Sequence, residues 1–292
     1  NSWNQVGNSI LADTINDQTG RTVVTNALGN RIAVGAHYRS FQTAYDNRGF
    51  VRIFEFNGTS WVQLGSSIWG ESDSDLSGYA IAMNATGSRV AISAYRNDGG
   101  YQDGGQVRIY EWNGTDWLQI GYDIDGGTIN EQSGTSIALN DAGDRVIIGA
   151  SNYYDQQTSS YSVGKVRIYQ YQVNSWHQLG DDITGFSQYE QLGKSVDISS
   201  NGDIIAVGSL GSNYTGEVKI YSWDGIDWIQ HGQTILGDAS YDQFGTAISL
   251  NNNGNRLAIG SPFNDESGAE SGKVKIFDWS GSNWVQIGSG LK

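Results

Sequence analysis

Short stretches in which apolar and polar residues alternate recur along the whole chain, each bounded by Gly, Asn or Asp. In the third repeat these stretches are 134–140, 144–150, 165–171 and 176–180. A period of two is typical of β-strands, whereas an amphipathic helix needs a period of 3.6. We therefore predict an all-β chain in which each repeat forms a four-stranded antiparallel meander.

The repeat itself is marked by the motif Trp-x-Gln-x-Gly, which occurs six times at intervals of 52 to 59 residues. The copies begin at Trp3, Trp61, Trp117, Trp176, Trp228 and Trp284. A period of about 50 residues that contains several short strands indicates a radially repeated β-sheet protein. The prediction is a single domain over 1–292, a five-bladed β-propeller of four-stranded antiparallel blades with one surplus outer strand at 1–10. The blades are expected at approximately 17–68, 75–124, 131–183, 190–235 and 242–292.

Two strands of each repeat have a recognisable composition. The first begins with Gly and alternates small with aliphatic residues, so we expect it at the crowded centre of the ring. Its glycines are Gly20, Gly78, Gly134, Gly193 and Gly245. The third strand reads Val, cation, Ile, aromatic, which suits a blade that is packed on both sides. The ten Trp residues suggest sugar binding, but pairs such as Trp112 and Trp117 flank a hairpin, which favours a structural role.

The chain holds one more outer strand than five blades need. Residues 3–10 and 284–291 are the same segment of the repeat, so in a closed ring they would compete for one place. An unpaired strand is a template for pairing with another chain, and head-to-tail pairing that does not close gives polymers. The alternative is a longer array of repeats that is cut in mid-repeat.

Composition narrows the classes of partner. The net charge is −14 and no Lys or Arg cluster interrupts the acidity, which disfavours nucleic acid and anionic membranes. The absence of Cys excludes disulfides and thiolate metal sites. No apolar run approaches the roughly 20 residues of a membrane span, so no membrane insertion is expected. Residues 1–15 lack the basic start and apolar centre of a signal peptide.

Residues 244–262 carry a family resemblance. They read Phe-Gly-Thr-Ala-Ile-Ser-Leu, a Gly turn, then Leu-Ala-Ile-Gly-Ser-Pro, and this resembles the FG-GAP repeat of integrin α-chain propellers and their microbial relatives. The resemblance extends loosely over all repeats and implies an extracellular propeller used for recognition or adhesion. FG-GAP repeats often carry a calcium loop between the first two strands, but here those connections are too short and too poor in carboxylates. No ligand residue is carried over, and no cofactor is expected.

The loops between the second and third strands are long, unequal and rich in Tyr, Asn, Ser and Gly. They span 37–49, 95–105, 151–164, 210–216 and 262–272, and the strand order places them on one face, here called the variable-loop face. Loops on a rigid scaffold are where binding usually occurs, although solvated loops without a ligand are the simpler interpretation. The expected contacts are Tyr95, Tyr101, Tyr153, Tyr154 and Tyr214.

An acidic residue stands three positions before each inner-strand Gly, on the same face. These residues are Asp17, Asp75, Glu131, Glu190 and Asp242. A ring of five carboxylates could seat a cation or the ammonium group of a partner Lys. In the structural alternative each carboxylate accepts N–H bonds from the turn that enters the strand.

No group of residues has motif-level support for catalysis. His37, His177 and His231 occupy unrelated positions of the repeat, and no carboxylate pair is singled out. We therefore expect a chain that is not an enzyme.

Four Asn-x-Ser/Thr sequons, about the number that chance gives, occur at Asn57, Asn84, Asn113 and Asn213. The function expected from the sequence is a non-catalytic extracellular or cell-surface module for interaction, adhesion or self-assembly. Its partner is a protein, which can be a second copy joined head to tail. The alternative is a lectin that binds glycans through the variable loops.

Overall fold

The computed structural model describes residues 2–13, 15–40, 46–211 and 214–291. These residues form 24 strands and no helix. They are grouped into five antiparallel sheets in chain order, and none of the described residues forms a helix long and apolar enough to cross a membrane.

The strands of the first sheet are β1 (Thr22–Thr25), β2 (Arg31–Ala36), β3 (Phe50–Phe56), β4 (Trp61–Gln63) and β5 (Ile68–Trp69). The second comprises β6 (Ile81–Met83), β7 (Arg89–Ala94), β8 (Gln106–Trp112), β9 (Trp117–Gln119) and β10 (Ile124–Asp125). The third comprises β11 (Ser136–Leu139), β12 (Arg145–Ala150), β13 (Lys165–Gln172), β14 (Ser175–Gln178) and β15 (Ile183–Thr184). The fourth comprises β16 (Ser195–Ile198), β17 (Ile204–Ser209), β18 (Glu217–Trp223), β19 (Trp228–Gln230) and β20 (Ile235–Leu236). The fifth comprises β21 (Ala247–Leu250), β22 (Arg256–Ser261), β23 (Lys273–Trp279) and β24 (Trp284–Leu291).

Each sheet is the expected four-stranded meander, with one addition. In the first four sheets a two-residue strand follows the Trp-x-Gln-x-Gly strand and returns to pair with the start of the third strand, as Ile68 does with Val51. In the fifth sheet β24 continues to the same place, where Leu291 pairs with Val274. The addition arises because the outer Trp strand pairs with only half of the longer third strand.

Hairpin aromatics pair across the outer turn in every sheet, as the sequence predicts. The ring centroids of Trp112 and Trp117 lie 5.5 Å apart, and those of Trp223 and Trp228 lie 5.4 Å apart. The rings are tilted by 52° and 53°, a favourable arrangement for aromatic pairs. The structural role of these aromatics is confirmed.

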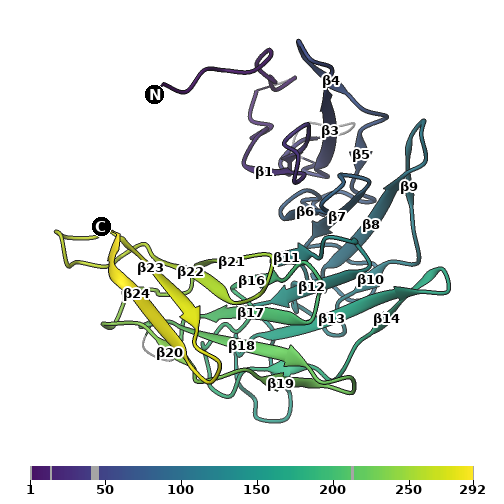
Figure 1. Cartoon of the computed structure of the whole chain (residues 1–292). Coiled ribbons are helices and arrows are strands. Elements are labelled where there is room, and N and C mark those ends of the chain that lie inside the picture. Colours follow the sequence, from purple (N-terminus) through teal and green to yellow (C-terminus); the bar gives the residue numbers. More distant parts are fainter. Residues whose placement is uncertain (1, 14, 41–45, 212–213, 292) are drawn as a thin grey trace.

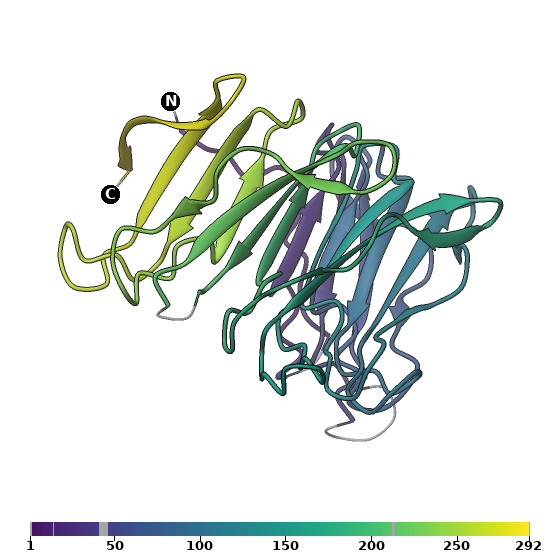
Figure 2. The same ribbon diagram turned by 90° about the horizontal axis from the view of Figure 1, so that it is seen from below.

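The sheets are arranged as an arc in which consecutive sheets lie face to face (Figures 1 and 2). The inner strands β1, β6, β11, β16 and β21 follow one another along its inner edge, each in contact with the next. The first and fifth sheets lie at the two ends of the arc (Figure 1). The outer face of each end sheet is therefore covered by no further sheet among the described residues.

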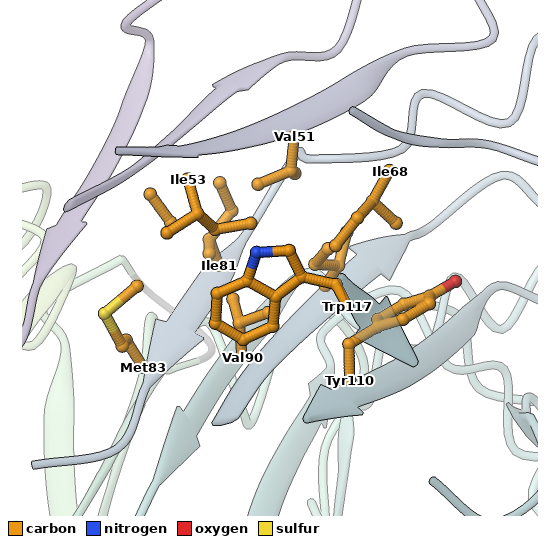
Figure 3. Close-up of a cluster of buried hydrophobic side chains, with 10 residues drawn as sticks. Val51, Ile53, Ile68, Ile81, Met83, Val90, Tyr110 and Trp117 are labelled. Atoms are coloured by element: carbon orange, nitrogen blue, oxygen red, sulfur yellow. The ribbon is translucent and has the colours of Figure 1, made fainter. Parts of the chain in front are cut away.

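The hydrophobic core is divided among the spaces between neighbouring sheets. Figure 3 shows the first of these, where the Trp117 indole of the second sheet lies among aliphatic side chains that come from both sheets. Val51 and Ile53 of the third strand of the first sheet meet Ile81 and Val90 there. The equivalent space between the third and fourth sheets encloses Ile168 and Trp228. Burial of apolar groups on both faces of a sheet is thus the main stabilising term of the repeat.

Candidate interaction surfaces

Every pair of neighbouring sheets is joined by the same indole hydrogen bond. The Nε1–H of each Trp-x-Gln-x-Gly tryptophan donates to the carbonyl three residues after the corresponding tryptophan of the preceding sheet. Trp228 donates to Leu179 O at 2.9 Å, and Trp284 donates to His231 O at 3.0 Å. The pairs Trp117 to Leu64 and Trp176 to Ile120 repeat it at 2.9 and 3.0 Å. The motif is therefore a device for joining sheets, because its Trp both fills the core and satisfies a partner carbonyl.

A second link joins the inner hairpin turns. A backbone N–H in the turn of one sheet donates to a carbonyl in the turn of the next. The series runs from Ala27 N to Ala85 O, Ala85 N to Asp141 O, Asp141 N to Ser200 O and Ser200 N to Asn252 O, with lengths of 3.0 to 3.2 Å. Each donor lies in sheet n and each acceptor in sheet n + 1, so the link has a direction along the arc.

Two positions of the second strand, an Arg at its start and a Gly near its end, also contact the next sheet. In the first three sheets the Arg that opens the second strand donates from Nη1 to a turn Gly carbonyl of the next sheet at 3.1 Å, as Arg145 does to Gly202. At the other end of the second strand, Gly149 and Gly208 lie against the backbone of the next sheet. A Cβ built at Gly208 would overlap the carbonyl oxygen of Gly245. Only glycine permits so close an approach of two backbones.

The outer face of the fifth sheet repeats these groups without a sheet to receive them. Among the residues that the structure describes, the Asn252 N–H has no turn carbonyl to donate to. The Arg256 side chain is 57% exposed, and its ion pair is with Asp278 of its own sheet. A Cβ built at Gly260 would meet nothing closer than Ala247 Cβ at 3.6 Å. A hollow of about 590 Å³ lies over this glycine, with Val274 and Leu291 in its lining.

The N-terminal segment covers part of the first sheet at the other end of the arc. The Trp61 indole donates to Val6 O at 3.0 Å and the Trp61 N–H to Asn8 Oδ1 at 2.8 Å. The Arg52 guanidinium binds the carboxylate of Asp13, which lowers the pKa of that group. Val6 stands three residues after Trp3, so the indole bond follows the rule of the internal pairs.

The two copies of the duplicated segment therefore occupy different places. The C-terminal copy is β24 of the fifth sheet, with Trp284 buried, whereas Trp3 of the N-terminal copy is fully exposed. No strand is assigned within residues 2–13. The N-terminal copy takes the position of an outer strand of a preceding sheet, but none of the described residues supplies inner strands beside it.

The five tyrosines selected from the sequence do not converge. Tyr154 packs on Tyr161 with ring centroids 4.8 Å apart, and Tyr214 stacks on Tyr241 at 6.2 Å. Tyr153 lies under the Lys165 ammonium group, 4.0 Å from the ring centroid, and Tyr101 is exposed. Tyr95 alone lies in one of the described hollows.

That hollow is polar and lies on the variable-loop face at the inner edge of the second, third and fourth sheets. Its volume is about 420 Å³, and its lining consists of Tyr79, Tyr95, Arg96, Gln132, Thr135, Ser151, Asn152 and Lys194. We call it the axial pocket. Tyr79, Thr135 and Lys194 are the residues directly after the inner-strand Gly, a position that the sequence analysis passed over. The repeat register could have found them, since all three occupy the same position of their repeats.

The five acidic residues are buried and individually bonded. Glu131 accepts the Gly127 N–H at 2.9 Å and Lys165 Nζ at 3.1 Å, and it also pairs with Arg167. Glu190 and Asp75 likewise accept N–H bonds from the turn three and four residues before them. Burial raises the pKa of the Asp75 carboxyl, against the opposing effect of these N–H donors.

The remaining two are held by side chains from the loop that follows. Asp17 pairs with Arg39 at 3.1 Å, and Asp242 accepts Asn264 Nδ2 at 2.7 Å. Within the described ranges, no group of three or more His, Asp or Glu residues is placed to hold a metal ion. Each carboxylate thus binds groups of a nearby turn or loop, and the five do not form one cluster.

Two of the predicted sequons lie on exposed outer turns and one does not. Asn57 and Asn113 are exposed and accept N–H bonds through Oδ1. Asn84 is buried in an inner turn, where Nδ2 donates to Thr86. Asn213 lies outside the described residues.

Comparison with known proteins supports the fold. No family model and no curated protein matches the sequence. A crystal structure described as a putative 6-phosphogluconolactonase from Bacteroides uniformis matches with a TM-score of 0.62 and 13% identity, over 92% of this chain and 71% of that one. TolB from Acinetobacter baumannii matches with a TM-score of 0.47 and 12% identity, over 88% of this chain and 51% of that one. With the five radial sheets, the first match identifies the fold as a β-propeller of five blades.

One expectation from the sequence has to be corrected. The conclusion that the chain is not an enzyme rested on the lack of a catalytic motif. The same fold occurs in a chain described as a putative 6-phosphogluconolactonase, so a propeller without a recognisable motif gives no ground to exclude catalysis. At 13% identity the likeness extends to the fold and assigns no activity here.

Proposed function

We propose that this chain is an interaction module that assembles head to tail with further copies of itself. The observation that supports this most directly is the outer face of the fifth sheet, which presents the joining groups of an internal sheet with none of the described sheets over them. The FG-GAP resemblance supports an extracellular or cell-surface setting for such a module. The lectin alternative has less support, because of the five selected tyrosines only Tyr95 lines the axial pocket.

The occupant that fits this face is the first sheet of a second copy. That sheet carries the carbonyl groups that accept these bonds between neighbouring sheets within the chain. Ala27 O would accept the Asn252 N–H, and Gly29 O would accept the Arg256 side chain. Gly20 O would approach Gly260, as Gly245 O approaches Gly208. The Trp61 indole would then donate to Ile287 O, the atom that stands three residues after Trp284. Within one chain these groups lie at opposite ends of the arc (Figure 1).

Assembly in this form requires that residues 1–10 leave the first sheet. They hold the position that β24 of the neighbouring copy would take over Trp61. Among the described residues, they contact the first sheet through two hydrogen bonds from Trp61 and through Gly7, which packs on the Trp61 ring, and the Asp13–Arg52 pair lies nearby. β24 is held by a full strand pairing with β23 and by the buried Trp284. The N-terminal segment is therefore a competitor that limits assembly.

The test is the solution mass over a wide range of concentration, by analytical ultracentrifugation. We expect a concentration-dependent series of oligomers that Val274→Glu abolishes, because a charge would be buried on the joined face. The matched control is Leu118→Glu on the outer strand of a middle sheet, which should leave the series unchanged. Val274 and Leu118 are 38% and 55% exposed, so neither change disturbs the interior of the monomer.

Deletion of residues 1–10 should strengthen the association, since the competitor is removed. Loss of association on this deletion would contradict the displacement and show that the segment itself bridges the copies. A wild-type chain that stays monomeric at every concentration, or that fits a closed ring in small-angle scattering, would overturn the proposal.

A further inference from the structure

Cations are scarce in this chain, and nearly all of them are used in ion pairs. There are 17 Lys and Arg residues against 31 Asp and Glu. Lys292 lies outside the described residues, and thirteen others pair with a carboxylate. The three described cations without a carboxylate partner are Arg21, Arg96 and Lys194. All three come from the inner edge of the sheets on the variable-loop face.

Two of these three cations line the axial pocket, and no carboxylate lines it with them. Arg96 follows the second strand of the second sheet, and Lys194 follows the inner-strand Gly of the fourth sheet. Both residues therefore line one hollow of about 420 Å³ and come from two different sheets. The net negative charge of the protein repels anions at long range. An anion in this pocket must therefore be held by short-range contacts.

Contacts within the lining order part of the axial pocket. The Tyr79 and Tyr95 rings lie 4.3 Å apart, and the Arg96 guanidinium carbon lies 5.7 Å from the centroid of Tyr95. Burial raises the pKa of the Tyr95 phenol above its ordinary range, and the hydroxyl is a neutral donor at neutral pH. Across the pocket, Thr135 Oγ1 accepts the Ser151 N–H at 3.2 Å. Arg96 and Lys194 are exposed, so their side chains lose conformational entropy when they bind a ligand, and the ordered rings and hydroxyl groups around them lose little.

We propose that the axial pocket binds a small anionic polyol, the shared chemistry of sugar phosphates and sugar acids. Arg96 and Lys194 receive the phosphate or carboxylate group, Arg as a two-pronged donor and Lys as a point charge. The amides of Gln132 and Asn152 and the hydroxyl of Thr135 are suited to the ligand's hydroxyl groups. The volume lies within the range of about 300–1,000 Å³ that is usual for small-molecule sites. This inference does not depend on the assembly proposed above.

Isothermal titration of the whole chain tests the site with four probes: glucose 6-phosphate, glucuronate, inorganic phosphate and glucose. We expect at least one of the two anionic sugars to bind at least tenfold more tightly than glucose, with an affinity that falls as salt is added. Comparison of glucose 6-phosphate with glucuronate shows whether the pocket prefers a phosphate or a carboxylate group. If phosphate alone binds as tightly as glucose 6-phosphate, the polyol part of the proposal is wrong.

Variants connect the binding to the pocket. Arg96→Gln and Lys194→Gln should each weaken the anionic sugar at least tenfold. Arg21→Gln is the matched control, because it removes an unpaired cation that does not line the pocket, and it should change the affinity less than threefold. Equal losses in all three variants would show a general charge effect and overturn the site, as would binding of glucose as tight as that of the anions.

Folding and assembly are checked separately. Unchanged circular dichroism and Tm of the variants would exclude unfolding as the cause of lost binding. The oligomer series of Arg96→Gln should equal that of the wild type, so that a failure of the anion site and a failure of the assembly are read from different measurements.

Discussion

Two surfaces of the repeat carry the same residue types and differ in what lies opposite them. One is the interface between the third and fourth sheets, and the other is the outer face of the fifth sheet. In the interface Gly149 lies against the Gly193 carbonyl, Arg145 donates to Gly202 O and the Trp228 indole donates to Leu179 O. On the outer face Gly260 and Arg256 stand at the first two of these positions, and none of the sheets that the structure describes lies opposite them. The difference teaches that the groups that join two sheets belong to the repeat itself, so they are present whether or not a sheet lies opposite them.

The largest difference is expected between an internal and a terminal tryptophan of the same motif. Trp228→Ala removes a buried indole and should lower the free energy of unfolding by about 3–5 kcal/mol. Trp3→Ala removes a fully exposed one and should change it by less than about 0.5 kcal/mol. Urea denaturation of both variants measures the two values. Similar losses would mean that residues 3–10 are packed as tightly as an internal strand.

A glycine pair separates the joint from its exposed counterpart. Gly208→Ala places a methyl group on the Gly245 carbonyl and should cost about 1–3 kcal/mol of stability. Gly260→Ala occupies the same position of the repeat in open space, so the monomer should change by less than about 0.5 kcal/mol. The second variant should instead weaken self-association. Equal destabilisation by the two changes in thermal unfolding would break the comparison.

Low pH should weaken one joint in particular. Burial of His37 between the first two sheets, helped by the nearby Arg21 charge, lowers its pKa to about 4. The unfolded chain binds this proton near pH 6.5 and the folded chain only near pH 4, so stability falls as the pH falls through this window. We expect a loss of roughly 1–2 kcal/mol between pH 6.5 and 4.5.

Two variants isolate this effect from that of the carboxylates. His37→Gln should remove the loss between pH 6.5 and 4.5 in chemical denaturation, and His177→Gln, at an exposed position, should retain it. The equivalent positions in the other sheets hold Tyr95, Ser151, Leu210 and Pro262, none of which titrates in this range. A pH dependence that is the same in wild type and His37→Gln would assign it to other groups.

The smallest expected effect is the difference between sequons on exposed outer turns and the sequon in a buried inner turn. In a host that attaches N-glycans, Asn57→Gln and Asn113→Gln should each reduce the mass, because both side chains lie on exposed outer turns. Asn84→Gln should leave the mass unchanged and lower stability by about 1 kcal/mol, since its Oδ1 accepts the Arg89 N–H at 2.9 Å in a buried turn. Mass spectrometry and thermal unfolding measure the two outcomes. A glycan at Asn84 would show that this inner turn opens.

The predicted site followed from the sequence only in part. Long Tyr-rich loops drew attention to the variable-loop face, yet the structure pairs Tyr154 with Tyr161 and Tyr214 with Tyr241 through ring contacts between residues that no local pattern connects. Arg96 and Lys194 come together across three sheets and share no motif. The position of each residue within its repeat can be read from the sequence. Whether the two residues line one pocket depends on how neighbouring sheets are rotated relative to one another.

The sequence by itself determined what is local: the strands, the hairpin turns with their aromatic pairs, the order within each sheet and the five-fold repeat. These follow from alternation with a period of two and from turn residues, both of which act over a few positions. The tertiary structure alone decided that the sheets form an arc, that the two Trp-x-Gln-x-Gly copies at its ends occupy different places, and that the acidic residues serve separate loops. The angle between sheets is set by side-chain packing at each joint, and small contributions from four joints add up along the arc.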